Sequence, residues 1–435
     1  MSLIKKKLYQ QVLKKLANLQ LAISLLFLIG ILIALGTFIE QDQPLNFYKE
    51  NYPEINPVFG FVTWKLITYT QFNQIYSSYW FIVILAFFGA TLIACTFTTQ
   101  LPSLKQFRLW RFIKDKERLQ TFNSKEKFSR FAMNSISYYL NKKKYHTFRQ
   151  GEQIYAYSGL LGRFAPIIVH VSILVLLLGS TIGSLNGYTA QEVIPRGEIF
   201  HIQNLIKSGT FGYVPQNLSW RVNDFWITYT KEAKINQFYS DLSILDKNGN
   251  EIKRKTIFVN EPFVYNGLTL YQTDWNIIGI KFKFDDKKVI QVPLKKISKQ
   301  GRNFWFGSIF LNKDSSKKLS VVVNDLRGNI FFYDNQGKLI KEYSIGEKFF
   351  INNNSSIEFY DFISSTGLQI KIDPGIRTVY LSFFLLMCST YVSFVSYSQI
   401  WGREEKELVT LAGKSNRAVL YFQEEFRRIK FIVKN

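Results

Sequence analysis

The stretch that decides the fold is Ile167-Ile168-Val169-His170-Val171-Ser172-Ile173-Leu174-Val175-Leu176-Leu177-Leu178, an apolar run with one ionisable residue. A helix rises 1.5 Å per residue, so about 20 apolar residues cross the ~30 Å hydrocarbon core of a bilayer. His170 therefore lies inside a predicted membrane span. Ionisable side chains there face the interior of a helix bundle, where they bind a ligand or proton or hold a neighbouring helix. The residues alone leave both roles open.

Three further segments have the same apolar character. Residues 21–39, 80–97 and 377–397 join residues 164–185 as predicted spans. The first of them continues past its apolar core without a small-residue cleavage site, so we expect a membrane anchor and not a cleaved signal peptide. The sequence thus predicts a membrane protein with four transmembrane helices.

The net charge of +23 is unevenly distributed along the chain. Residues 1–20, 98–163 and 398–435 carry 27 basic and 9 acidic residues, a net +18, while the rest carries a net +5. This is the positive-inside pattern, which places those three segments on the cytoplasm-like side. The loop 40–79 and residues 186–376 then lie across the membrane. No nucleic-acid binding module accompanies the charge, so we interpret the basic clusters as topology signals.

The large segment 186–376 has the period-two alternation of β-strands, punctuated by turns. Its predicted strands are 225–230, 241–245, 255–259, 268–271, 280–284, 319–323, 329–333 and 368–372. Residues 246–250 read as a hairpin loop between two of them. No strong helical pattern interrupts the strands, so we expect one β-rich domain with its own core, a sandwich or open barrel.

The remaining features do not indicate catalysis by the chain alone. Residues 57–67 are predicted to form an interfacial helix in the 40–79 loop, and residues 134–140 a short amphipathic helix. Cys95 and Cys388 form no Cys-x-x-Cys pair, so thioredoxin-like chemistry is excluded, and both are expected to be apolar packing residues. The sequence holds no phosphate-binding glycine loop, nucleophile motif or metal-spaced cluster.

Several strings resemble the ResB/CcsB family of cytochrome c biogenesis proteins. In the spans they are Gly36-Thr37-Phe38-Ile39-Glu40-Gln41, Ala94-Cys95-Thr96-Phe97-Thr98-Thr99-Gln100-Leu101-Pro102 and Gly162-Arg163-Phe164-Ala165-Pro166-Ile167-Ile168-Val169-His170. Elsewhere they are Gln237-Phe238-Tyr239-Ser240-Asp241-Leu242, Tyr265-Asn266-Gly267-Leu268-Thr269-Leu270-Tyr271-Gln272-Thr273-Asp274-Trp275 and Ser396-Tyr397-Ser398-Gln399-Ile400-Trp401-Gly402. The resemblance covers residues 16–402, in the family's order and four-span layout.

The resemblance implies the haem-delivery pathway called system II. In it a ResB/CcsB protein pairs with a CcsA-type membrane protein, exports haem, keeps it reduced and joins it to apocytochromes c such as cytochrome f and the soluble c-type cytochrome. The chain would then be a non-catalytic subunit of a cytochrome c haem-lyase complex. His170 matches the family's intramembrane histidine, taken as an axial haem ligand, and a neutral imidazole suits haem iron.

Other candidate residues follow from position. Arg163, near the start of the third span, could pair with a haem propionate or serve as a positive-inside anchor. His201 follows that span and is a second candidate, against the commoner role of a surface histidine. His146 reads as solvated. Where the family pattern leads us to expect Asp-His, this chain has Asn73-Gln74, so a ligand role for that loop is not carried over.

Abundant Lys, Ile, Asn and Phe without a transit peptide suggest an AT-rich organelle genome. We therefore expect a plastid-encoded thylakoid membrane protein with its large domain in the lumen, a cyanobacterial thylakoid protein being the alternative. Two other functions stay open: a scaffold that presents apocytochrome without binding haem, and a membrane sensor with a lumenal β domain.

Overall fold

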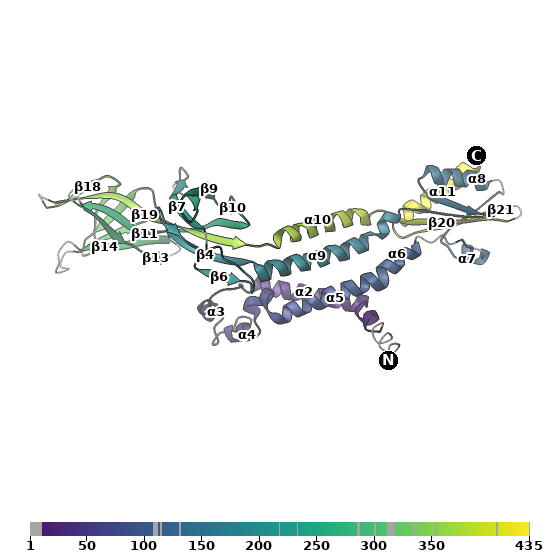
Figure 1. Ribbon diagram of the computed structural model, residues 1–435, viewed down its shortest axis with the longest axis horizontal. Coiled ribbons are helices and arrows are strands. Elements are labelled where there is room, and N and C mark those ends of the chain that lie inside the picture. The colour runs from purple at the N-terminus through teal and green to yellow at the C-terminus, as the bar shows by residue number, and fades with distance from the viewer. Residues whose placement is uncertain are drawn as a thin grey trace. The chain divides into compact units, whose positions relative to one another are not determined.

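The computed structural model describes the chain in two compact units, residues 1–181 with 375–435, and residues 182–374. The described residues are 11–107, 112–113, 115–129, 132–216, 218–232, 234–284, 288–299, 302–310, 318–334, 336–352, 355–405 and 408–434. Figure 1 shows the helices and strands of both units.

The first unit contains the four apolar helices, which confirms the predicted membrane protein class. They are α2 (Leu19–Phe38), α5 (Tyr79–Cys95), α9 (Ala165–Asn186) and α10 (Ile376–Ser393). The second apolar helix runs past the predicted end at residue 97. The π-helix η2 (Thr96–Gln100) and α6 (Leu101–Phe107) continue α5 directly, so that the apolar helix reaches Lys105.

Apolar side chains and small residues hold the helices together. Ile29 of α2 and Phe88 of α5 belong to one buried cluster, against which Leu177 of α9 packs. Gly179 brings α9 close to α10, because a side-chain carbon at this position would lie 3.0 Å from the Val379 backbone nitrogen. Close approach through small residues is the usual means of association between helices in lipid. In Figure 1, α9 and α10 run side by side accordingly.

The first unit also contains a small α/β domain that sequence analysis did not predict. Its five-stranded sheet has the order β1 (Ser124–Ser129), β21 (Leu408–Ser415), β20 (Ser398–Glu405), β3 (Gln153–Ser158) and β2 (His146–Gln150). The two longer helices, α8 (Ala132–Lys142) and α11 (Val419–Lys434), share a core with the sheet, while α7 (Lys116–Gln120) contributes Leu119 to a second, aromatic cluster. The predicted helix 134–140 is confirmed as part of α8.

This sheet constrains the topology of the chain in the membrane. Strand β3 precedes the third span, whereas β20 follows the fourth, and the two strands pair in antiparallel register from Ser158–Ser398 to Gln153–Arg403. Strands of one sheet lie on one side of a bilayer, because an unpaired sheet edge is not tolerated in hydrocarbon. The segments 98–163 and 398–435 therefore share one side, as their basic charge predicts.

The loop between the first two spans folds differently from the prediction. It contains α3 (Leu45–Asn51), α4 (Trp64–Tyr69) and the 3-10 helix η1 (Phe72–Ser77). The helix predicted over 57–67 is wrong in its first half, where Val58 and Val62 form an isolated bridge around a turn. Phe59 and Gly60 have φ of 54° and 80° there, and this backbone cannot continue a helix.

The second unit is the β-rich domain, and its class was predicted correctly. A seven-stranded antiparallel sheet has the order β10-β11-β19-β4-β6, with β12 and β18 paired to β11 and β19. Its members are β4 (Tyr188–Pro195), β6 (Leu205–Ser208), β10 (Phe263–Tyr265), β11 (Leu268–Phe284), β12 (Lys288–Pro293), β18 (Lys348–Asn352) and β19 (Ser355–Ile372). A four-stranded sheet joins β5 (Ile199–Phe200), β7 (Ser219–Tyr229), β8 (Ile235–Leu245) and β9 (Glu251–Phe258).

A five-stranded sheet completes the domain with β13 (Lys295–Lys299), β14 (Arg302–Phe310), β15 (Lys318–Val323), β16 (Asn329–Tyr333) and β17 (Leu339–Ser344). The predicted strands 268–271 and 280–284 are parts of one strand, β11, which continues through irregularities near Asp274 and Gly279. The hairpin loop 246–250 lies between β8 and β9 as predicted.

The single core expected from the sequence is replaced by two. One core, around Trp220, lies between the four-stranded sheet and one half of the seven-stranded sheet. The other, around Trp305, lies between the five-stranded sheet and the other half. The paired strands β11 and β19 contribute residues to both, so the domain consists of two tandem sandwiches that share two long strands.

Candidate functional site

His170 lies in the second turn of α9 and faces the second apolar helix. Its Nδ1 is 2.9 Å from Oγ1 of Thr96, which is the first residue of the π-helix η2. Thr96 is 8% exposed, whereas His170 is half-buried. The intramembrane histidine and a buried hydroxyl on a neighbouring span therefore form one polar site inside the helical unit.

The local sequence explains the unusual turn at Thr96. The Thr96 hydroxyl donates to the carbonyl of Leu92, four residues back, at 2.7 Å, and Thr98 donates to Ala94 at the same distance. Such bonds to the preceding turn loosen the regular ladder of a helix and bend it. Single π turns within α-helices occur frequently at functional sites. Here the π turn lies opposite His170.

The chemistry available at this site is that of one imidazole in an apolar bundle. A charge in hydrocarbon is costly, so the neutral form of His170 is favoured there. A neutral imidazole is a good ligand for iron, and hydrogen bonding through one ring nitrogen orients it for ligation through the other. The site therefore fits a group that carries most of its own metal ligands and takes one from the protein.

Arg163 precedes α9, in the 3-10 helix η3 (Leu160–Arg163). Its guanidinium carbon lies 4.9 Å from the ring centroid of Tyr397, a cation–π contact, and burial lowers the pKa of the guanidinium. Next to it, a side-chain carbon at Gly162 would lie 2.0 Å from the Val395 carbonyl oxygen. The Gly-Arg pair thus fastens the start of the third span to the chain that follows the fourth.

The other two histidines lie elsewhere. His201 is exposed in the loop after β5, in the β-rich domain. His146 is exposed in β2 of the small α/β domain, with its ring 5.1 Å from that of Tyr157. The structure therefore brings together His170 and Thr96 and places His201 in the other unit.

The loop between the first two spans is fastened by a residue that sequence analysis did not single out. Gln41 donates to the Phe72 carbonyl and accepts from the Ile75 amide, both at 2.9 Å. Asn73 accepts the Asp42 amide through its backbone carbonyl, and Gln74 is exposed. Gln41 holds the two ends of this loop together. In the sequence, this residue could have been noticed as part of the family-like string that ends in Glu40-Gln41.

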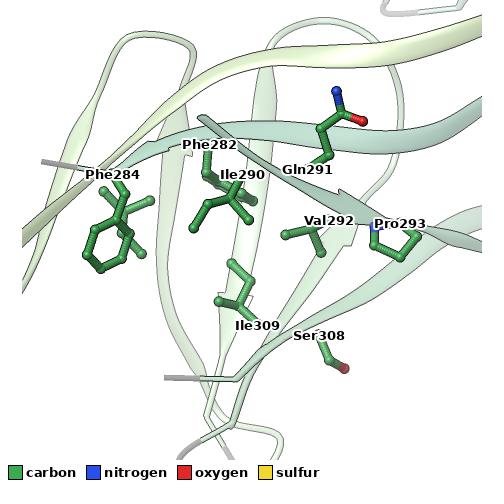
Figure 2. A pocket seen from close by; sticks show the side chains of 9 residues that line it. Phe282, Phe284, Ile290, Gln291, Val292, Pro293, Ser308 and Ile309 are labelled. Atoms are coloured by element: carbon green, nitrogen blue, oxygen red, sulfur yellow. The ribbon is translucent and has the colours of Figure 1, made fainter. Parts of the chain in front are cut away.

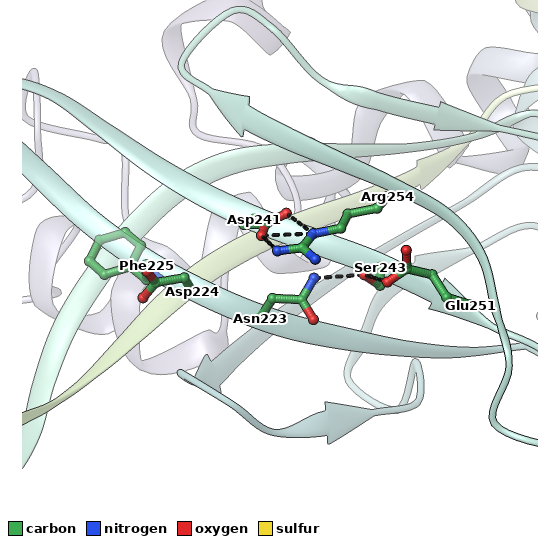
Figure 3. Close-up of polar contacts among 7 residues, drawn as sticks. All are labelled: Asn223, Asp224, Phe225, Asp241, Ser243, Glu251 and Arg254. Carbon is green, nitrogen blue, oxygen red and sulfur yellow. Dashed lines mark hydrogen bonds and ion pairs between the residues drawn. The ribbon is translucent and has the colours of Figure 1, made fainter.

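The β-rich domain carries polar clusters of a different kind. In Figure 3, Arg254 of β9 contacts Asp241 of the neighbouring strand β8, and its Nε donates to Oδ2 at 2.9 Å. Ser243 donates to Glu251 and accepts from Asn223, both at 2.6 Å. Each of these groups has its partner within the sheet, which is typical of a stabilising network.

A cavity of about 370 Å³ lies between β12 and β14, in the sandwich whose core surrounds Trp305 (Figure 2). Its lining is mostly apolar, with Gln291 and Ser308 as the polar members; the full lining is Phe282, Phe284, Ile290, Gln291, Val292, Pro293, Ser308, Ile309 and Ile357. No titratable side chain is among these described lining residues.

Comparison with protein families gives one match that spans nearly the whole chain. The model described as the ResB-like family matches residues 19–302 and 311–427. These ranges include the four apolar helices, the site at His170 and most of the β-rich domain.

Individual relatives align over similar lengths. A protein of Emiliania huxleyi called cytochrome c biogenesis protein Ccs1 is 60% identical over 423 residues, 97% of this chain and 96% of that protein. A Pyropia yezoensis protein of the same name is 45% identical over 96% of this chain and 94% of its own length. The cytochrome c biogenesis protein CcsB of a Picosynechococcus species is 39% identical over 98% of this chain and 92% of its own length.

Proposed function

The chain belongs to the ResB-like family and acts in cytochrome c biogenesis, and from this premise we propose that it works at the step that delivers haem to apocytochromes. Haem is the cargo in this proposal, and His170 supplies an axial ligand to its iron. The observation that carries the proposal is the imidazole of His170, inside an apolar helix and bonded through Nδ1 to Thr96 of a neighbouring span.

The residues of the site fit haem as a ligand. The porphyrin supplies four nitrogen ligands to its iron, so the protein needs to add one or two axial groups, and a histidine is the commonest. His170 is half-buried, which leaves part of the ring accessible from outside the polypeptide. The apolar side chains of the spans would exclude water from the ring of the cargo. Arg163 and His201 stay secondary candidates, for a propionate contact and a second ligand.

Charge and the shared sheet support the proposed orientation. The small α/β domain unites the two basic segments, so we place it on the stromal side and the β-rich domain in the lumen. Relatives from Pyropia yezoensis, Porphyra purpurea and the diatom Phaeodactylum tricornutum favour a plastid origin. We propose the thylakoid membrane as the location.

We propose that the chain acts in a complex. A CcsA-type membrane protein would be the partner in haem export, and the lumenal acceptors would be apocytochromes c. The chain's own role is to bind and orient: His170 holds the iron, and the spans exclude water. Attachment to the apocytochrome would be performed by the complex as a haem lyase, with this chain as a non-catalytic subunit.

The test is the absorption spectrum of the full chain purified together with its CcsA-type partner. We expect a Soret band and about one haem per complex by pyridine haemochrome assay, retained when the exposed His146 is replaced by Ala. A complex that supports holocytochrome formation but contains no haem at any stage would contradict the proposal. That outcome would favour a scaffold that presents apocytochrome.

A further inference from the structure

We propose that Thr96 is a positioning residue that fixes the tautomer of His170, so that Nδ1 carries the proton and Nε2 is the free ligand atom. The consequence of this tautomer, haem ligation through Nε2, rests on the proposed function. The tautomer itself is argued from the hydrogen bonds of the site.

The mechanism follows from counting protons at one hydroxyl. Thr96 Oγ1 lies 2.7 Å from the Leu92 carbonyl oxygen and 2.9 Å from His170 Nδ1. A threonine hydroxyl has one proton and two lone pairs, and a carbonyl oxygen can only accept. When the hydroxyl donates to Leu92, its contact with His170 is a hydrogen bond only if Nδ1–H is the donor. The neutral imidazole then has its lone pair on Nε2.

The opposite tautomer is unfavourable in this position. With the proton on Nε2, the Thr96 hydroxyl would have to turn toward Nδ1 and give up the Leu92 carbonyl. An N–H group at Nε2 would also need an acceptor within the span, because an unpaired polar group in hydrocarbon is costly. The Nδ1–H tautomer satisfies both bonds of Thr96 at once.

The π turn gives Thr96 this geometry. Thr96 opens the η2 turn at the end of α5 and is 8% exposed, so its hydroxyl is held between its own helix and α9. Thr98, two residues on, makes the same bond to its own helix, and its hydroxyl lies next to that of Thr99. Thr96 and Thr98 are therefore a matched pair: the same residue type and backbone bond, with one hydroxyl at the imidazole.

The bond has an electronic consequence for a bound haem. A histidine whose far nitrogen donates a hydrogen bond is a more basic ligand, and more basic axial ligands stabilise ferric over ferrous iron. Removing the acceptor at Thr96 should therefore raise the midpoint potential of haem bound through His170. A role in packing alone predicts no such shift, because a valine fills the same volume.

The tautomer can be read without haem. The chain contains three histidines, so ¹⁵N-histidine labelling of the full protein in nanodiscs gives few ring signals, and His170→Ala assigns the intramembrane pair by subtraction. We expect a protonated Nδ1 and an unprotonated Nε2 in the wild type, in Thr96→Ser and in Thr98→Val, but a loss of that pattern in Thr96→Val. A wild-type Nε2–H tautomer, or a Thr96→Val spectrum identical to wild type, would overturn the assignment of Thr96.

Measurements on the haem-containing complex distinguish a failure of this inference from a failure of the proposed function. In the complex with the CcsA-type partner, Thr96→Val should give a more positive midpoint potential, while Thr96→Ser and Thr98→Val should match the wild type. If His170→Ala lowers haem content but Thr96→Val leaves the potential unchanged, the role of Thr96 fails and haem ligation survives. If His170→Ala leaves haem content unchanged, the proposed function fails, whatever the tautomer.

Discussion

The two units of the protein bury polar groups in opposite ways. In the β-rich domain, Ser240, Gln272 and Thr366 lie in a triangle in which both hydroxyls can donate to the Gln272 carbonyl oxygen. The two hydroxyls are 2.8 Å apart, and Thr366 is 2.9 Å from that oxygen. The Gln272 amide also donates to the Asp274 carbonyl at 2.9 Å. In the helical unit, Nδ1 of the half-buried His170 lies 2.9 Å from the Thr96 hydroxyl.

We interpret the difference as one between a stabilising network and a proposed binding group. The triangle is almost fully buried and exchanges its bonds internally, which is what a buried polar cluster requires for stability. His170 is placed in hydrocarbon, where polarity costs most, and is half-accessible. In our proposal, the group that His170 binds offsets this cost.

The largest expected effect concerns the proposed topology, in which the small α/β domain and the β-rich domain are on opposite sides of the membrane. Protease added to sealed thylakoid vesicles should remove an epitope tag at the C-terminus, because α11 belongs to the small α/β domain, which we propose to be stromal. The β-rich domain should be cleaved only after the membrane is ruptured. Immunoblots against the tag and against a β-domain epitope measure both. Protection of the tag, or cleavage of the β-rich domain in intact vesicles, would contradict the proposed topology.

The next effect is on stability. Gln272→Leu removes the acceptor shared by two buried hydroxyls. One hydroxyl can then donate to the other, which leaves one unsatisfied at a cost of about 1–3 kcal/mol, so unfolding should become easier by about that amount. Thermal unfolding in detergent, followed by near-UV circular dichroism, measures the change. Gln291→Leu, at an exposed position of β12, is the matched control and should leave the unfolding temperature within error. Equal melting of both variants would show that the triangle is not stabilising.

A smaller effect, with the opposite sign, is expected at Tyr188. Its hydroxyl is buried, with no hydrogen-bond partner among the described residues, and burial raises its pKa to about 12. Tyr188→Phe should therefore stabilise the domain by about 1 kcal/mol at neutral pH.

The same group predicts a pH dependence. The unfolded phenol ionises near pH 10, whereas the folded one keeps its proton until about pH 12. The unfolded state thus binds fewer protons between these values, and stability is lost as the pH rises from 10 to 12. Tyr188→Phe should reduce this alkaline loss, while Tyr360→Phe, at a half-exposed tyrosine, should not. An unchanged pH profile in Tyr188→Phe would contradict the burial of its hydroxyl.

The smallest effect concerns the two cysteines. Replacing Cys95 and Cys388 together by Ala should leave cytochrome c assembly at the wild-type level, since the two thiols form no Cys-x-x-Cys pair. Haem staining of c-type cytochromes measures the outcome. Loss of assembly in a double variant that still accumulates would mean that the membrane region performs thiol chemistry.

Sequence patterns predicted the parts of the molecule that depend on local composition. The four spans follow from dense apolar runs, and strands such as 329–333 follow from alternation. The small α/β domain was missed because its sheet pairs β3 with β20, about 240 residues apart, across two spans. The two cores were missed because one long strand, β11, reads as two short ones where irregularities interrupt its alternation.

Sequence analysis identified one of the two residues that form the polar site. His170 stands out because an ionisable residue in an apolar run is rare. Thr96 does not, because a threonine near a span end has many uses, and its role depends on the pairing of two helices and on a π turn. The hydroxyl-rich run Thr96-Phe97-Thr98-Thr99 was the available signal. Arg163 was named for its charge, and the structure gives it an aromatic partner, Tyr397, that charge alone does not predict.

The central claim, that His170 is a haem ligand, is tested most directly by His170→Ala in cells that report holocytochrome formation. The variant should accumulate, since losing a buried imidazole changes stability by no more than about 1–2 kcal/mol, yet holocytochrome and co-purified haem should be lost. Added imidazole should restore part of both, and Ser172→Ala, a buried polar residue of the same helix, should behave as wild type. Normal haem content and normal cytochrome assembly in a stably accumulating His170→Ala protein would contradict the claim.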